Sequence, residues 1–254
     1  MNSLFSFHRI KLLAIRYLTE HWRREVISLS AFFIAFAFIP RLISGPSENV
    51  SPILFGAILL LGGARFTARI FHEIHHPSGG MHYVHIPASR WEKFLFNGVL
   101  SLLCYPVACL LLYYGGTLFG NLLEFVMPSF LNYRVIELSS LLPKQNIEEF
   151  VIQLLLYHAI FFLGSLFFKN HPTTKTFLSI ILFGFAISLV EIFLAKIIWG
   201  GIDSSPDSIE VKVVFFTQMI QNSTLASFIN YLITTIVLLF FWIVSYLKFR
   251  EKQV

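Results

Sequence analysis

The sequence predicts an all-α polytopic membrane protein with six transmembrane helices and an N-terminal interfacial helix, in a single membrane domain spanning residues 1–254. Apolar residues make up 56% of the chain and charged residues 13%, whereas soluble domains average about 45–50% and about 25%. The apolar residues gather in runs of about 20, the length that a helix needs to cross roughly 30 Å of hydrocarbon. The net charge of +5 does not indicate nucleic-acid binding, because the basic residues flank apolar runs.

The first 25 residues carry the pattern of an interfacial helix, which lies in the plane of the membrane surface. Arg9, Arg16, Glu20 and Arg23 fall on one helical face, and the opposite face is mostly apolar. This separation is typical of helices at the boundary between headgroups and acyl chains. We therefore expect residues 1–25 to form a helix of this kind ahead of the first span.

Six apolar runs follow, each about as long as the hydrocarbon layer is thick. Two of the segments between them, 119–149 and 200–227, are longer than simple connections. The second contains an apolar piece, Val211 to Ile220, which is too short to span and is typical of a re-entrant or outer-leaflet helix. The expected spans are Val26 to Ile43, Ile53 to Phe71, Phe94 to Leu118, Phe150 to Phe168, Thr176 to Trp199, and Phe228 to Leu247.

Lys and Arg residues are distributed unevenly between the two sides that these spans define. Fourteen of the nineteen fall in residues 1–25, 65–93, 169–175 and 248–252, four fall on the other side, and Lys196 lies within a span. Short segments rich in Lys and Arg tend to stay in the cytoplasm. Both termini are therefore expected in the cytoplasm, together with the segment between the second and third spans.

That segment, residues 72–93, holds five of the nine histidines, and His72, Glu73 and His76 fit the pattern H-E-x-x-H. On a helix this spacing places two histidines on one face to bind zinc, with the glutamate as general base. Pro77 to Gly80 follow at once and are expected to end the helix, which removes the rigid frame that such a site needs. A membrane-bound zinc metalloprotease is therefore one alternative function, and a non-transporting membrane scaffold is another.

Glu191 is the most notable polar residue within the spans, about 22 Å along the fifth span at 1.5 Å per residue. A charge at such a depth costs on the order of 2.5–3.5 kcal/mol on insertion scales, so we expect the side chain to face protein or water. Two interpretations remain open. Glu191 lies on a substrate or ion pathway, or it makes a structural hydrogen bond to a helix that presents Tyr113, Tyr157 or Asn230.

The stretch from Tyr83 to Phe94, YVHIPASRWEKF, resembles the LPASRxEKF segment of permease subunits from ABC transporters of the type-2 exporter superfamily, with Ile86 in place of the usual leucine. The expected layout of an interfacial helix and six spans is also similar. The resemblance implies that residues 72–93 couple the spans to a separate ATPase subunit. The motif has a local explanation too, because Ser89 can open a helix whose early Glu92 complements the positive helix end. The implied coupling residues are Glu73, Pro87, Ser89, Arg90, Glu92 and Lys93.

The same resemblance implies the partners. Chemistry would reside in an ABC ATPase subunit that binds ATP and Mg²⁺, while this chain would be a transport subunit without an ATPase site or cofactor of its own. The phosphate-binding pattern G-x-x-x-x-G-K-[ST] is absent from the sequence. A homodimer or a pair with a related permease is implied, as are contacts of Arg90 and Lys93 with lipid phosphates or the partner. We expect the protein in a cell membrane, a bacterial inner membrane, without a nucleic-acid partner.

Reporter fusions test this topology. Reporters placed after Lys252 or within 169–175 should read as cytoplasmic, because the basic flanks stay inside. Reporters within 119–147 and 200–225 should read as external. An external C-terminus would contradict the six-span arrangement.

Overall fold

The structure is a computed structural model that describes residues 6–43, 50–75, 77–126, 147–198 and 224–252. These residues are almost entirely helical, and none of them lies in a strand. The elements are α1 (Phe7–Ile43), α2 (Val50–Ala57), the π-helical turn η1 (Ile58–Gly62), α3 (Gly63–Arg69), the 3₁₀ turn η2 (His72–His75), α4 (Pro77–Val84), α5 (Arg90–Val99), the π-helical turn η3 (Leu100–Cys104), α6 (Tyr105–Val126), α7 (Ile147–Phe167), α8 (Pro172–Ile198) and α10 (Thr224–Glu251).

Five stretches of the described chain are long and apolar enough to cross a membrane, and they match the second to sixth expected spans. The all-α, polytopic membrane fold is therefore confirmed. The first expected span falls in the second part of α1, which is not one of these five stretches. The five stretches are Pro52–Arg69, Arg90–Leu123, Phe150–Phe167, Pro172–Leu194 and Tyr231–Glu251.

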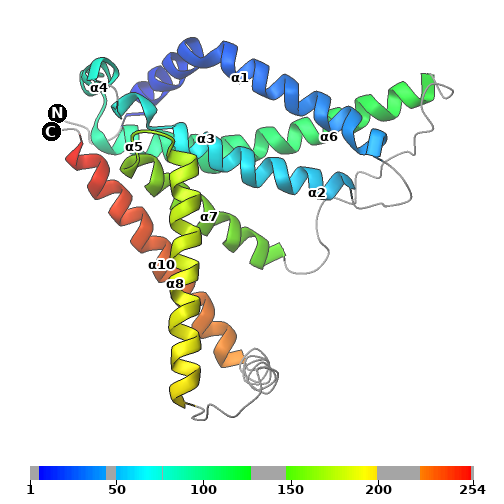
Figure 1. Ribbon diagram of the computed structural model, residues 1–254. Coiled ribbons are helices and arrows are strands. Elements are labelled where there is room, and N and C mark those ends of the chain that lie inside the picture. The colour runs from blue at the N-terminus through cyan, green and yellow to red at the C-terminus, as the bar shows by residue number, and fades with distance from the viewer. Residues whose placement is uncertain (1–5, 44–49, 76, 127–146, 199–223, 253–254) are drawn as a thin grey trace.

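The expected interfacial helix and the first expected span lie in one continuous helix, residues 7–43. No Gly or Pro interrupts α1 before Pro40. Figure 1 shows α1 changing direction partway along its length, so its first part and its second part run differently.

Most of the two long segments 119–149 and 200–227 falls outside the described residues. Of 119–149, the described parts extend α6 to Val126 and begin α7 at Ile147. Of 200–227, the described residues are those from Thr224 onward, which belong to α10. The predicted re-entrant piece Val211 to Ile220 lies outside the described residues.

The helices form a bundle in which α7 packs against α3, α8 and α10, while α1 packs against α2, α5 and α6. The start of α1, the start of α5 and the end of α10 meet at one end of the bundle, and α4 lies beside them (Figure 1). We call this region the polar end. At the opposite end α8 extends away from α1, α2 and α6 (Figure 1).

Close packing, not exclusion of water, holds membrane helices together. Gly116 on α6 faces the backbone of α1, where an added Cβ would lie 2.9 Å from the carbonyl oxygen of Phe33 and 2.9 Å from Cβ of Phe36. Beside this contact the ring of Tyr113 is fully buried, with centroids 5.4 Å from Phe36 and 5.5 Å from Phe55. The small residue therefore allows the approach, and the aromatic rings fill the space next to it.

Replacing Gly116 by alanine should lower the thermal unfolding midpoint of the purified protein. The added methyl group meets backbone atoms that cannot turn aside, and overpacking costs about 1–3 kcal/mol. Gly184→Ala is the matched control, because nothing lies within 4 Å of a Cβ there. Alanine raises helix stability by up to about 1 kcal/mol relative to glycine, so the control should be unchanged or more stable. Equal midpoints for the two variants would contradict the close approach of α1 and α6.

Candidate functional site

The described residues of the segment 72–93 form short helices joined by a turn, whereas a loop was expected. The turn η2 is followed by α4, which begins at Pro77, a residue whose fixed φ suits the first helical position. Pro77 to Gly80 therefore open a helix. Residues 85–88 then form a turn, and Ser89 begins α5.

Ser89 and Glu92 form a capping box at the start of α5, where a helix was expected to open. Ser89 Oγ accepts a hydrogen bond from the backbone N–H of Glu92 at 3.2 Å, and Glu92 Oε2 accepts one from the N–H of Ser89 at 2.7 Å. Glu92 Oε1 also accepts from the N–H of Ser6 at 2.6 Å and pairs with Arg9 at 3.2 Å. The side chain of Glu92 is fully buried, so this carboxylate joins α5 to the start of α1 and is not a surface contact.

Lys93 is also internal, which corrects the expectation that it contacts lipid or a partner. Its side chain is 3% exposed, and Nζ donates hydrogen bonds to the carbonyl oxygens of Tyr83 at 2.9 Å and Val84 at 3.2 Å. The ammonium group also lies 5.3 Å from the centre of the Tyr83 ring, in a cation–π contact. Lys93 therefore binds the end of α4, while Arg90 is exposed as expected.

A row of buried polar residues continues from Lys93 into the bundle, and it was not predicted from the sequence. Asn97 donates to the Tyr83 hydroxyl at 2.9 Å, and the Ser101 hydroxyl lies 2.7 Å from Nε2 of His158. Lys93, Asn97 and Ser101 recur every fourth residue, which places them on one helix face. This spacing was the available signal, whereas nothing local marks His158 as their partner.

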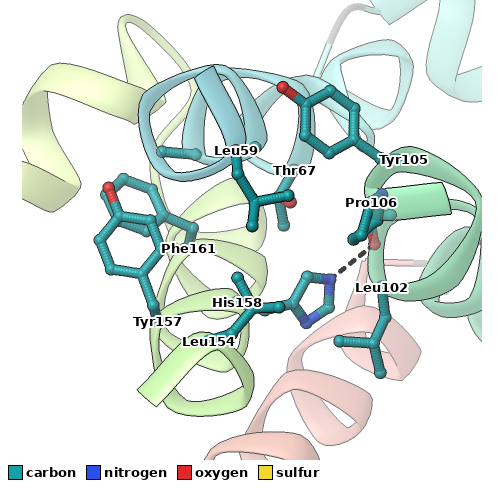
Figure 2. Close-up of a pocket in the computed structure, with 12 residues that line it drawn as sticks. Leu59, Thr67, Leu102, Tyr105, Pro106, Leu154, Tyr157, His158 and Phe161 are labelled. Carbon is teal, nitrogen blue, oxygen red and sulfur yellow. Dashed lines mark hydrogen bonds between the residues drawn. The ribbon is translucent and has the colours of Figure 1, made fainter. Parts of the chain in front are cut away.

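His158 lies beside a small cavity between α3, α6 and α7, with Leu59, Thr67 and Tyr157 around it (Figure 2). The cavity has a volume of about 20 Å³, enough for a single water molecule. Two π-helical turns flank it, and the Tyr105 hydroxyl donates to the carbonyl oxygen of Ile58 in one of them at 2.9 Å. Such turns free backbone carbonyl groups, and here a side chain satisfies one of them.

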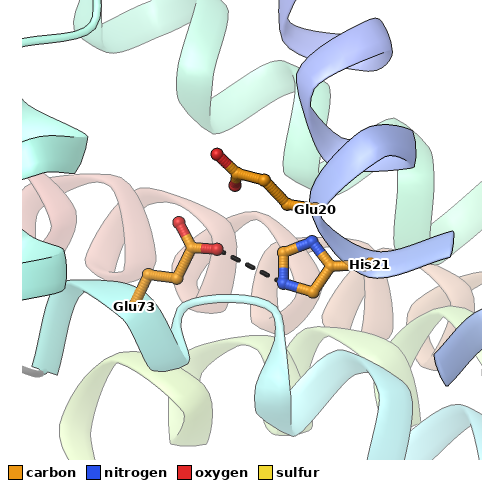
Figure 3. Close-up of side chains that lie close together, drawn as sticks. All are labelled: Glu20, His21 and Glu73. Atoms are coloured by element: carbon orange, nitrogen blue, oxygen red, sulfur yellow. Dashed lines mark ion pairs between the residues drawn. The ribbon is translucent and has the colours of Figure 1, made fainter. Parts of the chain in front are cut away.

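Glu73 faces the N-terminal helix. Its carboxylate lies 3.3 Å from Arg16 and 3.3 Å from Nε2 of His21, and Glu20 lies close by (Figure 3). Glu20, His21 and Glu73 each offer a ligand atom within 4.8 Å of the others, so these three residues could hold a metal ion. Arg16 already contacts both carboxylates, at 2.7 Å from Glu20 and 3.3 Å from Glu73. A guanidinium thus supplies the positive charge in this arrangement.

The histidine pair of the H-E-x-x-H pattern does not lie on the α-helix that a zinc site of this spacing requires. Residues 72–75 form a 3₁₀ turn, in which the face shared by residues i and i+4 of an α-helix is not formed. His72 is exposed and Glu73 turns to α1, while His76 lies outside the described residues.

His75 connects the same turn to two further helices. Its Nε2 lies 2.7 Å from the carbonyl oxygen of Ser165 on α7, and Lys252 donates from Nζ to Nδ1 at 2.9 Å. This pattern assigns a neutral ring with the proton on Nε2. Burial lowers the pKa of His75 below its ordinary value of 6.5, and the nearby charges of Lys252, His72 and Lys169 act in the same direction.

Glu191 lies on the outer part of α8, where the described residues from 181 to 194 are all exposed. The expected hydrogen bonds to Tyr113 or Tyr157 are not formed. Tyr113 is buried among rings of α1 and α2, and the ring of Tyr157 packs on Phe161. The side chain of Asn230 lies outside the described residues. In the part of the chain that the structure describes, the side chain of Glu191 is therefore exposed.

Comparisons with known proteins found no matching family model, no matching curated protein and no matching solved structure. The geometry alone defines the site. Residues 72–93 contact three other parts of the chain. Glu92 and Glu73 pair with Arg9 and Arg16 of α1, and His75 contacts the carbonyl oxygen of Ser165 on α7 and Lys252, which follows α10. Such an arrangement can pass a displacement of the segment to several spans at once.

The contact between His75 and Lys252 should weaken as the pH falls below about 6.5, the ordinary pKa of histidine. A pKa that is lower in the folded than in the unfolded protein means that the unfolded chain binds more protons in this range, so stability is lost on acidification. We expect the thermal midpoint, or the amide exchange protection of residues 72–75, to fall between pH 7.5 and 5.5.

His75→Gln should remove most of this pH dependence, since glutamine does not titrate. His8→Gln is the matched control, because His8 is exposed on α1. The control variant should keep the pH dependence of the original protein. An unchanged profile in His75→Gln would show that His75 does not cause it.

Proposed function

We propose that this protein is the membrane-spanning permease subunit of an ATP-driven exporter, and that residues 72–93 couple it to a separate ATPase subunit. Support comes from the resemblance of residues 83–94 to the permease segment and from the attachment of residues 72–93 to the bundle. The attachment of residues 72–93 to the bundle carries the proposal, because a coupling element needs hydrogen bonds or ion pairs to the helices that it moves.

Three separate connections provide this attachment. Glu92 holds the start of α1 through Arg9 and Ser6. Glu73 holds α1 through Arg16, about two helical turns further along the same face. His75 adds α7 and the end of α10. Because α1 and α10 belong to different parts of the bundle, a push on the segment would act on both.

Other side chains of the segment remain on the surface and form the face that we assign to the ATPase. Met81 is 68% exposed, Trp91 is 49% exposed and Val84 is 43% exposed, with Arg90 beside them in the chain. The ring of Trp91 stacks on Tyr246 of α10 at 3.8 Å between centroids. A partner bound at this face would therefore contact a residue that is packed on the last span. Apolar and aromatic anchors next to an arginine are typical of protein interfaces.

The exposed outer part of α8 is where we place the second permease subunit of the assembly. This surface is apolar except for Ser188 and Glu191, and the carboxyl group of Glu191 would otherwise face lipid. A neighbouring subunit that supplies a polar partner would remove that cost. The assembly would then be a homodimer or a pair with a related permease.

The proposal predicts that the purified chain hydrolyses no ATP alone and co-purifies with a P-loop ATPase that mass spectrometry identifies. Arg90→Glu should weaken this association roughly tenfold, equal to about 1.4 kcal/mol, because a charge reversal at an interface acts directly on the partner. The defect should depend on ionic strength. Unlike Glu92, Arg90 is exposed, so the change should leave the bundle intact.

Lys175→Glu is the matched control, since Lys175 is an exposed basic residue near the start of α8 and outside the segment. It should retain the association. Undiminished recovery of ATPase activity with Arg90→Glu and with Met81→Asp would contradict the proposed docking face.

A further inference from the structure

A separate feature of the polar end is an open cavity of about 300 Å³ between α1 and the turn that follows α4. This volume lies at the lower limit of the usual range for small-molecule sites. The residues around it are basic or apolar, and no carboxylate is among them. They are Arg9, Leu12, Leu13 and Arg16 of α1, with His82, His85, Ile86, Pro87 and Ala88 opposite. We propose that this cavity binds the phosphate headgroup of an anionic membrane phospholipid.

The two arginines are held in place by contacts on their other sides. Arg9 pairs with the buried carboxylate of Glu92, and Arg16 pairs with Glu20 through Nε and with Glu73 through one terminal nitrogen. A guanidinium carries five N–H donors, so the two contacts of Arg16 leave three for a ligand. Arginines fixed in this way bind phosphate in two-pronged geometry with little loss of side-chain freedom.

The apolar residues around the cavity are the reason for proposing a lipid as the ligand. Leu12 and Leu13 of α1 face Ile86, Pro87 and Ala88 across the cavity, so that apolar surface adjoins the basic groups. Leu12 is 49% exposed. A ligand that matches this surface has a phosphate next to a hydrocarbon portion, which inorganic phosphate lacks.

The depth of the cavity supports the same ligand. Arg9 pairs with Glu92, which lies in the first turn of α5, where the membrane-spanning stretch Arg90–Leu123 begins. The cavity therefore lies where hydrocarbon meets headgroups. Basic residues at this level attract anionic lipid. The proposal does not depend on an ATPase partner, and its test uses the purified chain alone.

The test measures the thermal midpoint of the full chain in neutral phosphatidylcholine nanodiscs, as phosphatidylglycerol replaces part of the lipid at about 0.15 M salt, where exposed charges are largely screened. We expect a midpoint that rises and saturates with phosphatidylglycerol. Native mass spectrometry should show one tightly retained phosphatidylglycerol per chain. Inorganic phosphate should not shift the midpoint, and a shift as large as that from the lipid would overturn the assignment in favour of a soluble phosphate site.

The double variant His82→Glu with His85→Glu places two acids in the cavity without touching the arginine pairs. It should reduce the apparent affinity for phosphatidylglycerol at least tenfold. His8→Glu makes the same change on an exposed residue that does not line the cavity, and should alter the affinity by less than twofold. Ala88→Leu fills the cavity without changing charge and should also weaken binding. Retained affinity in both the double variant and Ala88→Leu would refute the site.

Discussion

The buried carboxylate of Glu92 is the constraint on which the polar end of this protein depends. A charge at the edge of the hydrocarbon is costly unless it is paired and hydrogen-bonded. Glu92 meets this requirement with the N–H groups of Ser89 and Ser6 and the guanidinium of Arg9. The start of α1 must therefore lie against the start of α5. Arg16 follows Arg9 by about two helical turns, so the same face of α1 reaches Glu73.

Further connections extend outward from this contact in a definite order. Lys93 follows Glu92 in the chain and closes the end of α4 by binding two of its carbonyl oxygens. Glu73 attaches the start of residues 72–93 to α1, and Glu92 attaches their end. The turn that contains His75 then lies between α7 and Lys252. Local and long-range bonds thus agree, which is the condition for one well-defined arrangement. Removing the charge of Glu92 would remove its ion pair with Arg9 and would loosen the polar end.

Local sequence signals predicted those features that depend on local physics. Apolar runs predicted the spans, and the residue types of Ser89 and Glu92 predicted the start of α5, because both follow from properties of neighbouring residues. The burial of Lys93 was not predicted, since a lysine near a span is expected to extend to the surface. The contact between Ser101 and His158 joins residues 57 positions apart, and only the packing of α7 reveals it. The continuity of α1 was also missed, because a change in amphipathic pattern does not require a break in the helix.

The contrast between α1 and α8 explains where a change of shape can occur. In lipid no hydrophobic force drives helices together, so a helix is held only where its side chains interlock with a neighbour. Helix α8 interlocks near its start, where Gly164 of α7 accepts Thr176 and Phe161 packs on Phe177. Beyond residue 180 the described part of α8 is exposed, and its only carboxylate is Glu191. An export cycle of the kind we propose would act on the polar end, where the bonds are dense, and would produce its largest displacement along α8, where they are few. A second subunit bound to that surface would then offset the free-energy cost of placing the Glu191 carboxyl group in lipid, and it would move together with α8.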